Sequence, residues 1–105
     1  MMTLDDFRNS FADKTPPSGL SPELIALWHD GSGNWGTAHQ LAQYEPGSDM
    51  ARIHAYLHRK EGDTTNANYW YKKAGIAQHN GSLKEEFNKI AEYLLNKGSH
   101  CSLDF

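Results

Sequence analysis

Apolar residues return at helical spacing along most of the chain, and no segment alternates apolar and polar residues as a half-buried strand does. The clearest helical stripe covers residues 83–94. A second strong pattern runs from Met50 to Gly75, where two apolar-periodic segments flank a short polar turn. These patterns predict an all-α fold. The four main predicted helices lie near residues 35–44, 49–61, 66–75 and 82–96.

Start and stop signals predict where these helices begin and end. Ser21 followed by Pro22 is typical of a helix start. Gly62 is predicted to end one helix in a left-handed conformation, and the polar residues 63–66 to begin the next. Gly98 is predicted to end the last helix. The other predicted N-caps are Thr3, Asn34 and Ser82.

The length and the loop signals predict one all-α domain over residues 1–105. Residues 1–33 are expected to form an N-terminal helical arm. Residues 34–98 are expected to form two successive antiparallel helical hairpins, because short connections favour such pairs. Residues 99–105 are expected to form a C-terminal tail that docks through Leu103 and Phe105.

The segment 66–75, NANYWYKKAG, is followed by a glycine-containing turn and a second helical pattern. This arrangement resembles the first helix of Sel1-like repeats, which are relatives of the tetratricopeptide repeat. The resemblance covers about residues 35–98 and is stronger in its second half. It implies helical hairpins of the repeat type and a role in binding other proteins.

A longer motif resembles a group of small uncharacterised microbial and fungal proteins. Their shared core reads AH-x-x-x-Q and then HA-x-LHR-x-EGD-x-x-NA-x-YWY-x-x-AG, which here starts at Ala38 and at His54 and ends at Gly75. Arg52 stands where that group carries an aromatic residue. The resemblance implies membership of the group and brings no activity with it.

The net charge and the lengths of the apolar runs exclude some classes of binding partner. The net charge of -3 argues against nonspecific nucleic-acid binding, which needs a clustered basic surface. No apolar run approaches the roughly 20 residues of a membrane span. We therefore expect a protein or small-molecule partner of unknown identity, and neither nucleic acid nor membrane.

Aromatic residues make up 11% of the chain and can fill a thin helical core. Trp70 shares a helical face with Ala67 and Ala74, which permit close approach of a neighbouring helix. We therefore expect Trp70 to be largely buried against the helix that contains Leu57.

The chain has one cysteine, Cys101, so no disulfide can form within it and a reducing compartment fits. The first eleven residues are acidic where a signal peptide needs a basic start and an apolar stretch. These features predict a cytoplasmic location.

Histidines supply the densest chemical signal. His54 and His58 are four residues apart, Glu61 follows on the same helical face, and His39 lies on the preceding predicted helix. Two such histidines can share a metal ion with a carboxylate or a third histidine. Ala55 follows His54, so the glutamate of the metalloprotease motif H-E-x-x-H is missing.

Two further interpretations compete with a metal site. In a metal-free pocket, the imidazoles would bind an anion or transfer a proton, Trp70 would stack on the ligand, and Asn66 and Glu61 would contact its polar edge. Alternatively, the histidines are structural and bond to neighbouring groups. The sequence alone favours this structural interpretation. It predicts no bound transition metal, no cofactor and no catalytic residue, with a candidate ligand-binding set of His39, His54, His58, Glu61, Asn66 and Trp70.

The sequence favours a small non-enzymatic module of helical-repeat type that binds a protein or a ligand. The alternative is a small enzyme or metal-binding protein that uses His39, His54, His58 and Glu61. Whether the protein is an enzyme stays open at the level of sequence.

Overall fold

The computed structural model describes residues 2–102, with side chains as far as Lys97. Within this range the chain forms α-helices joined by short loops and contains no β-strand, which confirms the all-α prediction for the described part. The elements are α1 (Leu4–Asn9), a 3-10 turn η1 (Ser10–Ala12), α2 (Pro22–Gly31), α3 (Trp35–Tyr44), α4 (Ser48–Lys60), α5 (Thr64–Ala74) and α6 (Leu83–Ser102).

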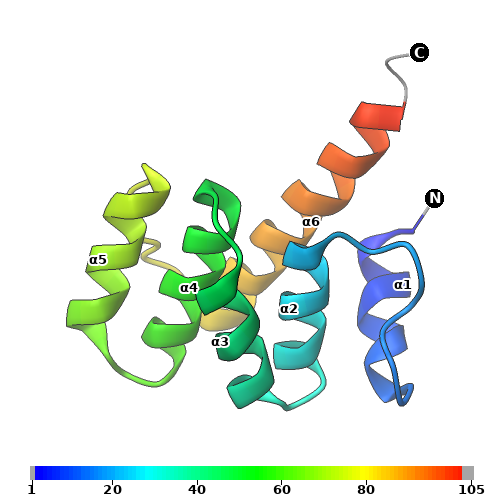
Figure 1. Cartoon of the computed structure of the whole chain (residues 1–105), viewed down its shortest axis with the longest axis horizontal. Helices are drawn as coiled ribbons and strands as arrows, with labels where there is room; N and C mark the ends of the chain where they lie inside the picture. Colours follow the sequence, from blue (N-terminus) through cyan, green and yellow to red (C-terminus); the bar gives the residue numbers. More distant parts are fainter. Residues whose placement is uncertain (1, 103–105) are drawn as a thin grey trace.

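Helices α2 to α5 lie side by side in chain order, and α6 packs across α1, α2 and α4 (Figure 1). Helix α5 stands at one end of this row and packs mainly against α4. Among the described residues, no helix combines the length and the apolar character that a membrane span requires.

The predicted caps begin the helices. Each side-chain oxygen accepts a hydrogen bond from a backbone amide of the first turn, which satisfies a donor that the helix itself leaves unpaired. In α1 the bond is reciprocal, because the Asp6 carboxylate accepts a hydrogen bond from the Thr3 amide. The confirmed caps are Thr3, Ser21, Asn34, Asp63 and Ser82.

The last helix does not end at Gly98 as predicted, because α6 continues to Ser102. A glycine within a helix costs about 1 kcal/mol relative to alanine, which weakens the helix without stopping it. The docking contacts predicted for Leu103 and Phe105 lie outside the described residues.

The main core joins α2, α4 and α6, with contributions from α1 and α3. Leu27, Ile53 and Leu57 are fully buried at its centre. The segment predicted as an N-terminal arm takes part in this core, since Phe7 is fully buried and its ring stacks on Phe87 of α6 with centroids 6.4 Å apart.

A second, smaller apolar cluster attaches α5 to α4. It contains Ala55 of α4 and Ala67 and Tyr71 of α5, all buried. Ala67 lies in this interface as predicted, whereas Ala74, the other alanine predicted to permit close approach, is not part of the cluster. Polar contacts that join α4 and α5 to α6 add to this attachment.

The strongest of these polar contacts converges on Glu86 of α6, whose side chain is 2% exposed. Its carboxylate accepts one hydrogen bond from Arg59 Nη1 of α4 at 2.9 Å and another from the Tyr71 hydroxyl of α5. Arg59 also donates through Nη2 to the carbonyl oxygen of Gly81, in the connection between α5 and α6. One buried charge therefore joins three helices and a loop.

We expect Gly62→Ala to destabilise the protein by about 1 kcal/mol or more, because Gly62 has a φ of +86° that a β-carbon disfavours. Gly36→Ala in α3 is the matched control. A β-carbon added at Gly36 would have no atom within 4 Å and the φ there is not positive, so alanine should stabilise by up to about 1 kcal/mol. Urea unfolding measures both, and equal effects would contradict the conformational explanation.

We expect Tyr71→Phe to lower the free energy of unfolding by about 1–3 kcal/mol, since it removes a hydrogen bond to a buried carboxylate and leaves the ring in place. Tyr69→Phe is the control on the same helix, because Tyr69 is exposed. A Tyr71→Phe protein as stable as the Tyr69→Phe protein would show that the Glu86 contact contributes nothing.

Candidate functional site

Three histidines meet where α3 packs against α4. His39 comes from α3, and His54 and His58 come from successive turns of α4. One ring nitrogen from each of the three lies within 4.8 Å of the other two. The shortest separation is 3.1 Å, between Nε2 of His39 and Nε2 of His54.

Local contacts fix α3 in the position that brings His39 to α4. Trp35 donates from its indole nitrogen to the carbonyl oxygen of Leu57 at 2.9 Å. Its ring then stacks on His39, four residues later on the same helical face, with centroids 4.8 Å apart and planes 7° apart. The imidazole of His39 is therefore held between Trp35 and the two histidines of α4.

Trp70 of α5 covers the other side of the cluster. Its ring stacks on His54 with centroids 3.9 Å apart and planes 18° apart. Trp70 packs against α4 as predicted, and most of its surface is buried, although it is not fully enclosed. Ala67 and Tyr71 occupy the innermost face of α5, so Trp70, one position away, lies at the edge of the interface.

Glu61 holds one side of His58. Its Oε1 lies 2.7 Å from His58 Nδ1, which confirms the predicted pairing of the two side chains. This contact directs Nδ1 toward the carboxylate, so Nε2 is the nitrogen through which His58 can act as a ligand.

Two acidic or polar residues near the cluster have other roles. Asp63 lies within 4.8 Å of His58 and Glu61 by its ligand atom, but it is also the N-cap of α5. Asn66 donates from its side-chain amide to Asp63 at 2.7 Å and is exposed. Asn66, a member of the predicted set, thus contributes a hydrogen bond at the start of α5.

Burial and mutual proximity favour the neutral form of His54 and of His39. Burial, together with His39 and His58, lowers the pKa of His54 to about 4. Burial and His58 also lower the pKa of His39, while Glu61 acts in the opposite direction. Neutral imidazoles offer nitrogen lone pairs, the form in which histidine binds a metal.

The distances suit a metal ion bound by three imidazoles. Two nitrogens bound to one tetrahedral zinc ion at the usual bond length lie about 3.3 Å apart, and the centroids of their rings lie about 5 Å apart. The nitrogens of His39 and His54 are 3.1 Å apart, and the three centroid separations are 4.8, 5.0 and 4.8 Å. Glu61 on the second nitrogen of His58 matches the carboxylate that commonly orients a metal-bound histidine.

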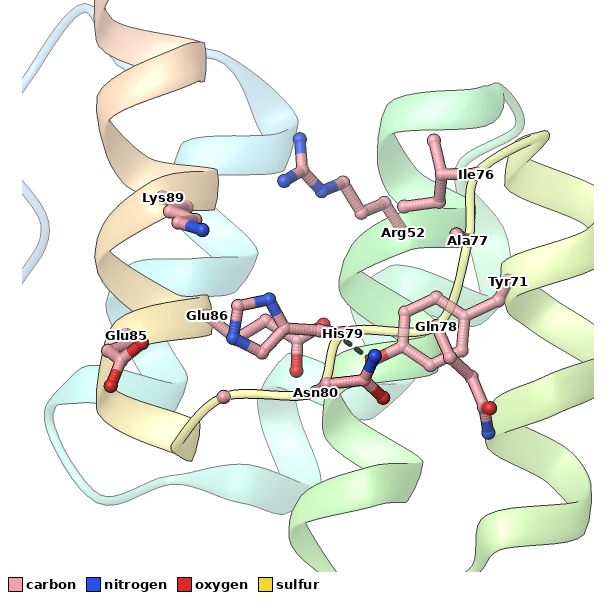
Figure 2. Close-up of a pocket in the computed structure, with 11 residues that line it drawn as sticks. Arg52, Tyr71, Ile76, Ala77, Gln78, His79, Asn80, Glu85, Glu86 and Lys89 are labelled. Atoms are coloured by element: carbon pink, nitrogen blue, oxygen red, sulfur yellow. Dashed lines mark hydrogen bonds between the residues drawn. The ribbon is translucent and has the colours of Figure 1, made fainter.

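A second polar concavity, which no periodic pattern in the sequence indicates, lies between α4, α5 and α6 (Figure 2). It has a volume of about 430 Å³. Its lining includes Arg52 of α4, His79 of the α5–α6 connection and Lys89 of α6. The sequence predicts no role for His79. This residue lies in a loop, where no periodic spacing indicates which residues it contacts.

Metal-free protein should lose stability as the pH falls from about 6.5 toward 4, the interval between the ordinary histidine pKa and the pKa of folded His54. In this interval the unfolded chain binds a proton that folded His54 does not bind, so protonation favours unfolding. Between about pH 7 and pH 5 the loss should be on the order of 1–2 kcal/mol.

Urea unfolding of the wild type and of His54→Gln at both pH values isolates this contribution. The variant lacks the titrating group, so its stability should change less over the same interval. An equal loss in the two proteins would show that His54 does not resist protonation in the folded state.

No protein-family model, no curated protein and no solved structure matches the chain.

Proposed function

We propose that this protein is a small module that binds a divalent transition-metal ion through His39, His54 and His58. The observation that carries the proposal is the convergence of three imidazoles, with nitrogens of His39 and His54 3.1 Å apart and all three within 4.8 Å. The spacing of His54 and His58 alone could not distinguish a metal site from structural histidines. The proximity of His39 to His54 in the folded chain favours a metal site over purely structural histidines.

The donor set indicates the class of metal. Three imidazole nitrogens suit zinc, copper or nickel better than magnesium or calcium, which prefer oxygen ligands. Glu61 supports the site by accepting the Nδ1 proton of His58. Three protein ligands leave a fourth position for water or for a ligand group. The function proposed is binding, since the glutamate that serves as base in H-E-x-x-H is replaced by Ala55.

A protein-binding role of a repeat-type fold is the second candidate function. The packing of α3 on α4 fits the first of the two predicted hairpins, whereas α5 packs mainly on α4 and not on α6, as the second predicted hairpin would require. Tyr44 is 84% exposed and lines, with Trp70, a groove of about 480 Å³. A pull-down with wild-type protein and with Tyr44→Ser tests this role, and identical sets of retained proteins would count against it.

A cytoplasmic location stays a prediction from the sequence.

Tag-free protein, freed of metal and titrated with zinc in a calorimeter, should bind one ion per chain. His54→Gln should abolish this binding, because it removes a central ligand. Glu61→Gln should weaken it by about 10–100-fold, the usual effect of losing the carboxylate that orients a ligating histidine. Cobalt should give the absorption bands of a tetrahedral ion in the wild type.

His29→Gln is the matched control, because His29 is a half-buried histidine of α2 outside the cluster. It should leave the affinity for zinc unchanged. The proposal fails if the wild type shows no saturable binding at micromolar zinc. It also fails if His54→Gln and His29→Gln bind with the same affinity.

A further inference from the structure

The concavity between α4, α5 and α6 contains two buried nitrogens without partners. Nε of Arg52 and Nε2 of His79 are buried, and neither has a hydrogen-bond partner in the described part of the chain. Both residues line the same pocket. Buried polar atoms are normally paired, and Nε of arginine can only donate. The pocket therefore presents at least one donor that needs an acceptor.

Glu86, one of the two carboxylates that line the pocket, does not supply that acceptor. Glu86 and Tyr71 both line the pocket (Figure 2). Glu86 already accepts hydrogen bonds from Arg59 and from Tyr71. Glu86 and Arg59 therefore compensate each other in charge. Of the remaining charged residues that line the pocket, Arg52 and Lys89 are cationic and Glu85 is anionic.

The two cations approach the pocket from opposite helices. Figure 2 shows the Arg52 guanidinium extending from α4 toward α6, on which Lys89 lies, with His79 between the two helices. The guanidinium carbon of Arg52 also lies 5.6 Å from the centre of the Tyr93 ring of α6, which helps to fix its direction. A cation from each wall and a histidine nitrogen between them form an arrangement suited to an anion.

The loop that carries His79 is held in place by contacts already described. Arg59 donates to the carbonyl oxygen of Gly81. A β-carbon at Gly81 would lie 2.7 Å from His79 Nε2 and 2.6 Å from Glu85 Oε2, so glycine leaves the room that these side chains occupy. The site is thus preorganised by the network around Glu86.

We propose that this pocket binds the oxyanion group, carboxylate or phosphate, of a small polar molecule. Arg52 donates to the anion through Nε, His79 contributes its buried Nε2, and Lys89 adds charge at the solvent side. The volume of about 430 Å³ lies within the usual range for sites that bind small molecules. This proposal is independent of the metal site, since the two share no residue.

Nuclear magnetic resonance tests the proposal directly, because the Arg52 Nε–H group gives its own signal in a nitrogen-15 correlation spectrum. Full-length labelled protein is titrated separately with inorganic phosphate and with succinate at constant ionic strength. We expect at least one probe to shift the Arg52 Nε–H signal and the amides of residues 77–81 in a saturable way at millimolar concentration. The probe that saturates first distinguishes a phosphate site from a carboxylate site.

Two variants test the assigned contacts. Arg52→Lys keeps the charge and removes the Nε donor, so the affinity should fall about tenfold or more, as expected for one charge-assisted hydrogen bond. Lys89→Gln should also weaken binding. Lys84→Gln is its matched control, because Lys84 is an exposed lysine of α6 that does not line this pocket. The amide spectrum of each variant shows whether it is folded.

Three outcomes would overturn the proposal. The first is the absence of saturable shifts with both probes in the wild type. The second is an unchanged affinity in folded Arg52→Lys. The third is equal weakening by Lys84→Gln and Lys89→Gln, which would indicate a general response to charge and not a site.

Discussion

The fold depends most on the burial of one carboxylate, that of Glu86. An ionised carboxylate is costly to remove from water unless hydrogen bonds compensate it. Arg59 and Tyr71 provide these bonds from two other helices, and Arg59 reaches on to the backbone at Gly81. Only the native arrangement of α4, α5, α6 and the connection before α6 satisfies all of these groups together. The carboxylate therefore both attaches these elements to one another and determines their relative positions.

This constraint also explains why two candidate sites lie on either side of α5. Tyr71 points toward Glu86 and lines the pocket that Arg52 and His79 share. Trp70, the preceding residue, points toward α4 and stacks on His54. Because consecutive residues of a helix project about 100° apart, fixing Tyr71 also sets the direction of Trp70. The anion pocket and the histidine cluster thus share one helix as a wall without sharing a residue.

Local features were predictable from the sequence because they depend on neighbouring residues. The caps at Ser21 and Asp63, the positive φ of Gly62 and the pairing of His58 with Glu61 all involve positions within a few residues of each other. Features that depend on packing between distant segments were not predictable from the sequence. The 3.1 Å approach of His39 to His54, the position of Trp70 at the edge of its interface and the pairing of Glu86 with Tyr71 depend on how α3, α5 and α6 settle against α4. No spacing encodes the meeting of Arg52, His79 and Lys89, because each comes from a different element.

Trp70 and Tyr71 are consecutive residues with separate buried contacts, so the length of the helix before them limits how related sequences can differ. Substitutions at the exposed positions of α5, such as Tyr69 and Lys72, leave the two buried directions unchanged. Insertion or deletion of a single residue within 64–70 would rotate these side chains by about 100° relative to the start of the helix. Tyr71 would then leave Glu86 and Trp70 would leave His54 together. Related sequences should therefore vary in the composition of this segment but keep its length, whereas the loop at residues 13–19, which carries neither contact, is free to change in both.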